Sequence, residues 1–420
     1  MKLSSFGEKL TKKTGILELM DDLGRAMNTE KHLLMLGGGN PAHIPEVEKI
    51  WHKRWNEIAE NGDELERLLG NYTTPQGDAE FMEATADFFK RNYHWQISSK
   101  NIAVLNGSQT AFYFLFNMLA GKFSDGTEKK ILLPLVPEYI GYADQGISED
   151  MFLSVKPSIE FLENHTFKYH INFDEINVSE NIGAICLSRP TNPTGNVVTD
   201  EEVSRLHTLA KEHDVPFIID NAYGAPFPKI LFTDVNPIWD EHIIYVLTLS
   251  KLGLPSTRTS IVIANEEIIE KLTSINAIVS LSTGTLGQHL VLPYLKNDEV
   301  IKISSEIIQP FYQKKAEKAI AFFHEQMQGS EVDYYLHKSE GALFLWLWCK
   351  DLPISDYELY QRLKQRGVIV VPGNYFYPGL QEEWKQKKEC LRITYGQEEE
   401  MVHKGLAIIA EEVKKAYERG

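Results

Sequence analysis

Residues 183–220 read GAICLSRPTNPTGNVVTDEEVSRLHTLAKEHDVPFIID, and this stretch decides the fold class. It opens and closes with short apolar runs, Gly183 to Leu187 and Val215 to Ile219. Apolar runs of this length are typical of strands that are buried on both faces by flanking helices. The stretch therefore predicts two strands of one buried sheet.

The sequence between the two runs predicts a helix. Thr199 can act as its N-cap, and Glu202, three residues later, completes a capping box. We expect this helix to end at His213. A strand, a helix and a second strand in this order require parallel pairing with a right-handed crossover. The apolar side chains of the helix share one face: Val203, Leu206, Leu209 and Ala210.

Similar runs extend the pattern along the chain. We expect an α/β protein with a mostly parallel central sheet in a large domain, residues 56–305. Beyond Gln309 the pattern changes, so residues 1–55 and 306–420 are expected to form a small α+β domain. The further strands are predicted at Ile102 to Leu105, Lys130 to Leu135, Ile243 to Leu249, Ser260 to Ala264 and Gly341 to Trp348. Helices are predicted at Phe311 to Met327, Tyr357 to Arg366 and Glu398 to Arg419.

The composition argues against several classes of partner. The chain has 420 residues, 43% of them hydrophobic, and a formal net charge of −16. Nucleic acid and acidic membrane surfaces attract basic patches, so we expect neither as a partner. The three cysteines fit neither a disulfide framework nor a zinc site, so no metal is expected. The first residues lack an unbroken apolar stretch, and the longest apolar run is too short to span a bilayer. A cytoplasmic protein is therefore expected.

Polar residues follow the predicted strands, at the edge where α/β sheets bind ligands. Lys251 ends one apolar strand, where burial lowers the pKa of an ammonium group toward the free base that imine chemistry needs. Asp220 ends another, and a buried carboxylate there needs a cation. A protonated pyridine nitrogen would be that cation, and it would keep a bound ring electron-poor. Taken singly, Lys251 could be a solvated side chain and Asp220 an N-cap.

A phosphate site is predicted nearby. Gly107-Ser108-Gln109 opens the apolar helix Thr110 to Leu119, whose first N–H groups and positive dipole end favour an anion. Arg258, seven residues after Lys251, could form a bidentate pair with the same phosphate. The alternative is that glycine and serine serve only the geometry of the turn.

Four motifs then occur together in order: Asn192-Pro-Thr-Gly195, Asp220-x-x-Tyr223, Ser250-Lys251 through Pro255 to Arg258, and Leu391-Arg392-Ile-Thr394. In these motifs the chain resembles the fold-type-I aminotransferases, which depend on pyridoxal 5'-phosphate, and the resemblance covers essentially the whole chain. It implies an aspartate aminotransferase-like fold. One departure is the loop from Lys251 to Arg258, which is one residue shorter than in many relatives and carries Ser256 where glycine is common.

The resemblance also implies roles for single residues. Lys251 would join the cofactor as a Schiff base and move the substrate proton, and Asp220 would pair with the pyridinium nitrogen. Tyr223 and Asn192 would donate hydrogen bonds to the phenolic oxygen of the ring. Tyr139 would stack on the ring face, its alternative being an ordinary core aromatic. The residues that resemble the phosphate cup are Ser108, Gln109, Thr248 and Arg258.

The remaining likenesses concern the substrate and the assembly. Tyr72 resembles a tyrosine that reaches the phosphate from a neighbouring subunit, which implies a homodimer with shared active sites. Arg392 resembles the arginine that binds the substrate α-carboxylate, a task suited to its planar fork, although a surface ion pair is the alternative. Gly39 matches a substrate-facing glycine, and Asn192 would contact the substrate as well as the cofactor.

The expected substrates are amino acids and 2-oxo acids. The resemblance implies that an amino group moves between valine, alanine or another small aliphatic amino acid and pyruvate or 2-oxoisovalerate. The cycle would be ping-pong, through pyridoxamine phosphate. Because a methylene changes binding by only about 1–3 kcal/mol, the residues leave open alanine or aromatic specificity.

Three other activities are weighed against this one. The same lysine, aspartate and phosphate site could serve a carbon–sulfur β-lyase. A transcription regulator would need an added basic DNA-binding domain, which is not expected because the motifs begin by residue 37. An inert structural protein would give no reason for Asp220, Lys251 and Arg258 to sit together at strand boundaries.

Overall fold

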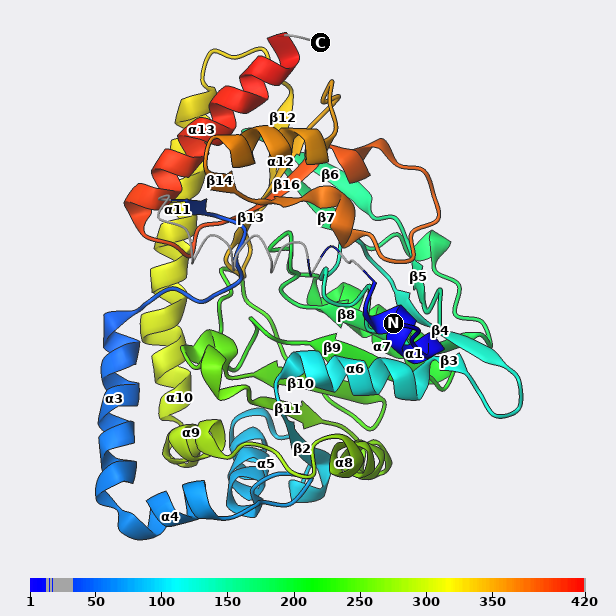
Figure 1. Ribbon diagram of the computed structural model, residues 1–420, viewed down its shortest axis with the longest axis vertical. Coiled ribbons are helices and arrows are strands. Elements are labelled where there is room, and N and C mark those ends of the chain that lie inside the picture. Colours follow the sequence, from blue (N-terminus) through cyan, green and yellow to red (C-terminus); the bar gives the residue numbers. More distant parts are fainter. Residues whose placement is uncertain (13–14, 16, 18–32, 419–420) are drawn as a thin grey trace.

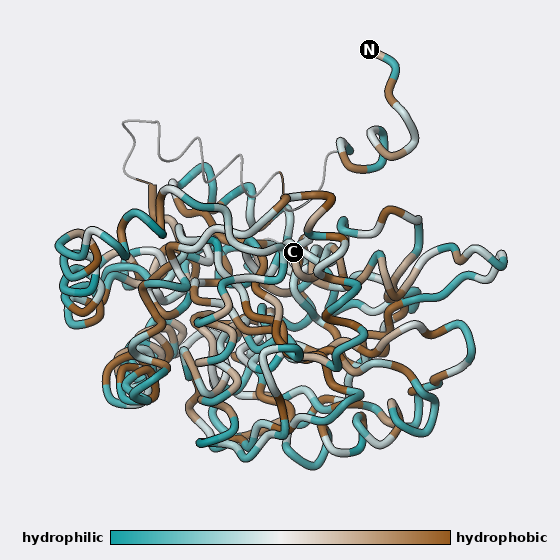
Figure 2. The backbone as a smooth tube through the Cα atoms, turned by 90° about the horizontal axis from the view of Figure 1, so that it is seen from below, coloured by the Kyte–Doolittle hydropathy of each residue, from teal (hydrophilic) through white to brown (hydrophobic). Residues whose placement is uncertain are grey.

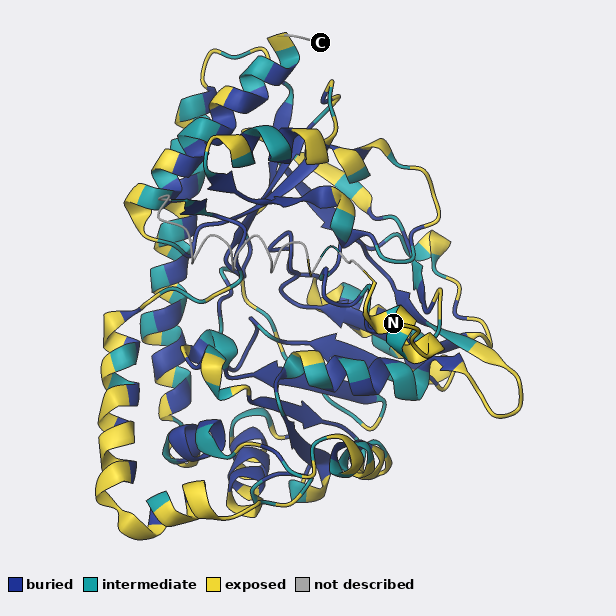
Figure 3. Ribbon diagram, in the orientation of Figure 1, coloured by how far each residue is buried: buried dark blue, intermediate teal, exposed yellow. Residues whose placement is uncertain are grey.

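A computed structural model describes residues 1–12, 15, 17 and 33–418. Its centre is an eight-stranded sheet in the order β2-β11-β10-β9-β8-β4-β3, with β5 paired to β4 (Figure 1). The strands are β2 (Ile102–Leu105), β3 (Gly121–Lys122), β4 (Glu128–Leu133), β5 (Phe152–Ser154), β8 (Ile182–Ser188), β9 (Phe217–Asp220), β10 (Ile243–Thr248) and β11 (Ser260–Ile263). Every residue of β2, β8, β9, β10 and β11 is buried, as expected for strands covered on both faces (Figure 3).

Residues 183–220 form the predicted strand–helix–strand unit. Strands β8 and β9 pair in parallel, and helix α7 (Asp200–Glu212) joins them. Thr199 and Glu202 form the expected capping box, and the helix has His213 as its C-cap. The run β10-β9-β8-β4-β5 is parallel throughout, whereas β11 and β3 pair antiparallel with their neighbours. The prediction of a mostly parallel sheet is confirmed.

Helices surround this sheet. They include α5 (Ala79–Tyr93), α6 (Ser108–Leu119), α8 (Glu266–Val279) and α9 (Leu286–Lys296). Helix α6 contacts β4, β10 and β11, and α7 contacts β8 and β9. Figure 2 shows the hydrophobic segments gathered inside the molecule and hydrophilic turns at its edge. This distribution follows from burying apolar strands between amphipathic helices.

A second, six-stranded sheet has the order β15-β16-β13-β12-β7-β6. Its strands are β6 (Ser158–Leu162), β7 (Thr166–His170), β12 (Tyr334–His337), β13 (Phe344–Cys349), β15 (Val371–Pro372) and β16 (Cys390–Thr394). Helices α11 (Gln309–Met327), α12 (Asp356–Gln365) and α13 (Glu399–Glu418) accompany it (Figure 1). The β6–β7 hairpin belongs to this sheet because β7 pairs in parallel with β12, although its residues lie within the range 56–305. Sequence adjacency did not reveal this long-range pairing.

The N-terminal part of the described chain lies beside the C-terminal part. Strand β1 (Leu34–Met35) pairs with β14 (Val368–Ile369), and helices α3 (Pro45–Glu60) and α4 (Gly62–Gly70) follow. A short helix, α1 (Ser5–Leu10), lies at the N-terminus. The division at residues 55 and 305 stays a prediction, and much of 1–32 lies outside the described residues. The boundary at 305 falls inside a helical run formed by α10 (Glu299–Lys302), η5 (Ile303–Ile308) and α11.

Within the part of the chain that the structure describes, no helix has both the length and the apolar content needed to span a bilayer.

Candidate active site

A cavity of about 610 Å³ opens where the carboxyl ends of β8, β9 and β10 meet the second sheet. The position agrees with the general rule for ligands of parallel sheets. Ser188 lies directly opposite Asp220 in the β8–β9 register, and Thr248 ends β10. The residues that line the cavity include Met35, Gly39, Ser108, Gln109, Tyr139, Ile140, Ser188, Asn192, Asp220, Tyr223, Thr248, Lys251, Arg258, Arg392 and Gln397.

Lys251 lies in the short helical turn η3 (Ser250–Leu252) that follows β10. Its Nζ donates a hydrogen bond to the carbonyl oxygen of Gly39 at 2.5 Å and lies 5.5 Å from the centre of the Tyr223 ring. Burial, reinforced by the positive charges of Arg392 and Arg258, lowers the pKa of Lys251 to about 8. About a tenth of this amine is therefore a free base at pH 7, far more than for an ordinary lysine, and the free base is the nucleophilic form.

Asp220 occupies the end of the neighbouring strand β9. The Tyr142 hydroxyl donates a hydrogen bond to Oδ2 at 2.5 Å, and the Ala222 N–H donates one to Oδ1 at 3.0 Å. Burial raises the pKa of Asp220 to about 6, while these hydrogen bonds and the charge of Lys251 oppose the rise. Both of its hydrogen-bond donors are neutral groups, so the carboxylate is placed to accept a cationic partner from the cavity.

The predicted phosphate site lies where Arg258 meets Gly107 at the start of α6. Gly107 is the N-cap of α6 and has φ +91°, so it supplies no side-chain cap and leaves the first N–H groups of the helix open. A Cβ atom on Gly107 would lie 2.1 Å from Nη2 of Arg258, so the guanidinium group rests on this glycine. The side-chain amide of Gln109 donates to the carbonyl of Gly141 at 3.2 Å. Ser108 and Gln109 begin α6, and N–H groups in the first turn of a helix can bind an anion.

The Gly107→Ala variant is expected to lose roughly ten- to a hundredfold in cofactor affinity, because the added methyl group displaces Arg258 and a charge-assisted hydrogen bond contributes about 1.5–3 kcal/mol. Titration of the apoprotein with pyridoxal phosphate, followed by absorbance, measures the effect. Gly126→Ala is the matched control, since Gly126 has φ +86° but no atom within 4 Å of its added Cβ. Equal dissociation constants for the Gly107→Ala and wild-type proteins would show that Arg258 does not hold the phosphate.

Arg392 comes from β16 of the second sheet and is buried. Its Nη1 donates to Oδ1 of Asn192 at 2.8 Å and its Nη2 to the carbonyl of Gly37 at 2.7 Å. The guanidinium group lies over the Phe344 ring at 4.3 Å and over the Phe376 ring at 5.2 Å. Both hydrogen-bond acceptors are neutral, and Nε has no partner among the described residues. A carboxylate in the cavity would complete this site.

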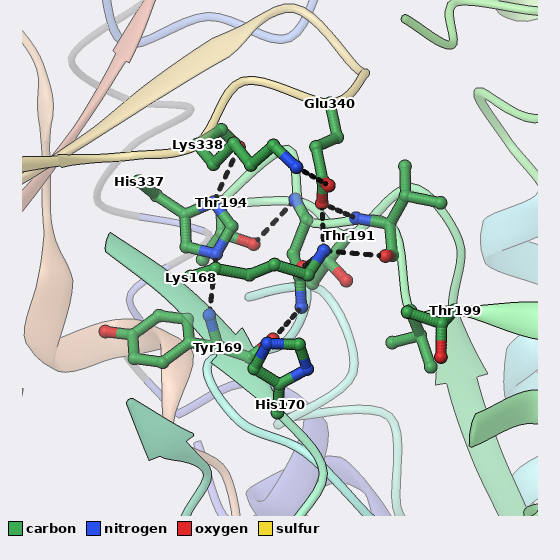
Figure 4. A network of polar contacts seen from close by, with 12 residues as sticks. Lys168, Tyr169, His170, Thr191, Thr194, Thr199, His337, Lys338 and Glu340 are labelled. Atoms are coloured by element: carbon green, nitrogen blue, oxygen red, sulfur yellow. Dashed lines mark hydrogen bonds and ion pairs between the residues drawn. The ribbon is translucent and has the colours of Figure 1, made fainter. Parts of the chain in front are cut away.

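A buried polar network fixes the loop that carries Asn192 (Figure 4). Lys168, from β7, forms an ion pair with Glu340 and donates to the carbonyl of Val197 at 3.0 Å and to Oδ1 of Asn196 at 3.1 Å. Glu340 also accepts the N–H of Val197 at 3.1 Å. The network ties the second sheet to the loop after β8. It therefore holds Asn192 in reach of Arg392.

The structure brings eleven of the twelve predicted site residues to one cavity, and Tyr72 lies elsewhere. Tyr72 is 84% exposed and does not line the cavity. Sequence reasoning missed Tyr142, which binds Asp220, and Phe344 and Phe376, which flank Arg392. Tyr142 could have been suspected, because it follows the predicted ring-stacking residue Tyr139 by only three positions. Neither Phe344 nor Phe376 lies beside a predicted site residue in the sequence, so no sequence pattern indicated them.

The residues present fit pyridoxal phosphate. Lys251 would hold its aldehyde, Asp220 its ring nitrogen, and Ser108, Gln109 and Arg258 its phosphate; a buried cation, Arg392, remains for an amino-acid carboxylate. The fold and the site thus define an enzyme that depends on pyridoxal phosphate and acts on amino acids. Residues 158–409 match the model of the family "Aminotransferase class I and II". The chain belongs to that family, and the protein is a pyridoxal-phosphate-dependent aminotransferase.

Individual relatives agree with this assignment. The chain is 45% identical over 417 residues to a valine–pyruvate aminotransferase of Escherichia coli (strain K12), with 99% of each chain covered. The crystal structure of a valine–pyruvate aminotransferase from Salmonella typhimurium LT2 matches with a TM-score of 0.89 and 44% identity, covering 96% of this chain and 100% of that one. An aspartate aminotransferase from Thermus thermophilus, 19% identical, shares the fold with a TM-score of 0.78 and coverage of 98% and 100%.

Proposed function

We propose that this aminotransferase moves the amino group between valine, alanine or another small aliphatic amino acid and pyruvate or 2-oxoisovalerate. The observation that carries the proposal is the 45% identity, over 99% of both chains, to the Escherichia coli valine–pyruvate aminotransferase. The two half-reactions would alternate in one cavity, as a ping-pong cycle requires. The roles of the site residues below are part of the same proposal.

The charges of the cavity favour a substrate with a neutral side chain. Among the lining residues that the structure describes, the cations are Lys251, Arg258 and Arg392. Lys251 and Arg258 serve the cofactor, and Arg392 serves the α-carboxylate. A second carboxylate, as in aspartate, would be desolvated without a cation of its own, which costs several kcal/mol. Ile140, which is buried, and Met35 add apolar surface that suits an aliphatic side chain.

Bound pyridoxal phosphate supplies an electrophilic carbonyl carbon and a ring that withdraws electrons from the substrate. The protein supplies the rest. Arg392 orients the α-carboxylate through the guanidinium edge that includes Nε. Asp220 holds the proton of the ring nitrogen, and Tyr142 keeps that carboxylate oriented. Tyr223 and Asn192 donate to the phenolic oxygen, and Tyr139 covers the ring face.

Lys251 has two tasks in this scheme. Its free amine first holds the cofactor, and after the substrate has taken its place Nζ accepts the proton from the substrate α-carbon. The pKa of about 8 suits both tasks, because a base works best when its pKa lies near the working pH. The carbonyl of Gly39, 2.5 Å from Nζ, would hold the free amine in the cavity between these steps.

A homodimer with shared active sites is the assembly we propose. Large apolar side chains are exposed on two segments, residues 69–72 and 278–281: Leu69, Tyr72, Ile278, Val279 and Leu281. The two segments lie together, since the Thr285 hydroxyl donates to the Leu68 carbonyl and the Asn276 amide donates to the Pro75 carbonyl. A partner subunit would cover this surface, and Tyr72 would reach the partner's phosphate.

We also propose a cytoplasmic location, which the three free cysteines suit.

An absorbance experiment tests the substrate assignment. The purified holoenzyme is mixed separately with valine, alanine, aspartate and phenylalanine at equal concentrations, and the conversion of the cofactor to its amine form is followed. Valine and alanine are expected to convert it at least about tenfold faster than aspartate, because burying the second carboxylate is costly. Chromatography should then show alanine formed from valine plus pyruvate.

Each other outcome has a clear meaning. Conversion by aspartate as fast as by valine would overturn the charge argument. Preferential conversion by phenylalanine would assign the enzyme an aromatic specificity instead. Release of hydrogen sulfide from a sulfur amino acid, without conversion by valine, would replace the proposal with a β-lyase.

A further inference from the structure

Glu138 is a fully buried carboxyl group beside the cofactor cavity. Its Oε1 accepts the Ser188 N–H at 2.8 Å, and its Oε2 accepts the Ser188 hydroxyl at 2.6 Å and the Tyr139 N–H at 3.1 Å. All three donors are neutral groups. A carboxyl group held in this way is costly to bury, so its retention needs a reason beyond packing.

The position of Glu138 supplies that reason. Its partner Ser188 is the register partner of Asp220 on the adjacent strand. Four residues after Glu138, Tyr142 donates to Asp220 itself. The segment 138–142 is therefore fastened at one end to β8 and at the other to β9. Tyr139, the proposed ring-stacking residue, lies between the two attachments and meets Tyr142 edge-on at 5.4 Å.

The electrostatic interactions of Glu138 also link it to Asp220 and Tyr142. Burial raises the pKa of Glu138 to about 8, against the hydrogen bonds from Ser188 and Tyr139 that lower it, and the charge of Asp220 raises it further. Cys186, Tyr142 and Asp220 are the titratable groups that interact with this carboxyl group or respond to it. The charges of Glu138 and Asp220 thus influence each other, and Asp220 is the carboxylate proposed to hold the ring nitrogen.

We propose that Glu138 is a positioning residue that acts through Ser188 and the segment 138–142. Its carboxyl group sets the plane of the Tyr139 ring and the hydrogen bond from Tyr142 to Asp220. The inference rests on the proposed role of Asp220 at the ring nitrogen. If the attachment to β8 is loosened, Tyr142 withdraws from Asp220, and this carboxylate would hold a proton on the nitrogen of a bound pyridine ring less firmly. A bound ring would then withdraw fewer electrons, which would raise the pH midpoint of the holoenzyme's visible absorbance.

The test compares Glu138→Gln with Asp356→Asn. Asp356 is the matched control because it is also a buried carboxyl group that accepts backbone N–H groups, those of Tyr357 at 2.9 Å and Asn374 at 2.8 Å, but it does not line the cavity. The measurements are the dissociation constant of pyridoxal phosphate, the pH midpoint of its visible absorbance in the holoenzyme, and the rate of the valine half-reaction.

For Glu138→Gln we expect the absorbance midpoint to rise by about 0.5 pH unit or more and the half-reaction to slow by about tenfold. Cofactor affinity should fall several-fold. Asp356→Asn should leave the dissociation constant and the half-reaction rate within about twofold and the absorbance midpoint unshifted, even where the melting temperature of the variant falls. Ser188→Ala removes one of the three hydrogen bonds to Glu138 and keeps the other two, so it should shift the midpoint in the same direction by less. It keeps the test valid if Glu138→Gln folds poorly.

A double-mutant cycle decides whether Glu138 acts through Tyr142. Because both changes would weaken one contact to Asp220, Glu138→Gln combined with Tyr142→Phe should be no slower than the slower single variant. Additive losses, or an unshifted absorbance midpoint in Glu138→Gln, would overturn the inference. Failure of the wild-type holoenzyme to react with valine would instead reject the proposed substrate, and the cofactor measurements would still judge Glu138.

Discussion

The Lys251→Ala variant is expected to lose at least about 10⁴-fold in turnover of valine with pyruvate, the upper end of what a single acid–base group contributes. The loss should be this large because one amine both holds the cofactor and carries the substrate proton. The methyl side chain of alanine at position 251 can neither hold the cofactor nor carry the proton. The measurement is the rate of alanine formation, with the wild-type holoenzyme run in parallel.

The fold of the Lys251→Ala apoprotein should persist. Burial depresses the pKa of Lys251 to about 8, below its ordinary value of 10.5, so the folded state binds fewer protons than the unfolded state between these values. Stability of the wild-type apoprotein therefore rises with pH across that window, and at pH 7 the buried amine is a cost. We expect the variant apoprotein to melt no lower than the wild type at pH 7. An undiminished rate of alanine formation would refute the role of this amine.

The Asp220→Ala variant is expected to bind pyridoxal phosphate yet slow the half-reaction by about 10²–10³-fold, as for other single electrostatic groups of an active site. Asp220 would keep a proton on the nitrogen of a bound pyridine ring, so without this carboxylate the ring would draw fewer electrons from the substrate α-carbon. Rapid-quench measurement of α-proton exchange tests this directly. Exchange at the wild-type rate would contradict it.

The same carboxyl group gives a pH signature in the apoprotein. Burial raises the pKa of Asp220 to about 6, above its ordinary 3.8, so its contribution to stability is full below pH 4 and is lost as the pH rises through 6. The shift corresponds to a penalty of up to about 3 kcal/mol at neutral pH. We therefore expect the Asp220→Asn apoprotein to be more stable than the wild-type apoprotein at pH 7. Saturation with cofactor should reverse the order, since the ring cation then compensates the carboxylate.

The sequence predicted the architecture of the first sheet because local signals were strong there. Thr199 and Glu202 mark the start of α7, and the apolar runs on either side had the length of buried strands. The β6–β7 hairpin lies within the range 56–305 but pairs with the second sheet, and no sequence signal pointed to this pairing. Its pairing with β12 joins residues about 170 positions apart, as in Leu336 opposite Thr166. No local pattern records such a partner.

The sequence by itself determined which chemistry the protein performs, since Lys251, Asp220, Arg258 and Arg392 occur in motifs that need no coordinates. Only the tertiary structure decided how these groups are tuned. Burial sets the pKa of Lys251 near 8, Tyr142 is turned toward Asp220, and Phe344 and Phe376 enclose Arg392. The physical reason is that a pKa or a contact depends on distance and dielectric surroundings, which form only when strands and loops remote in the chain are folded together.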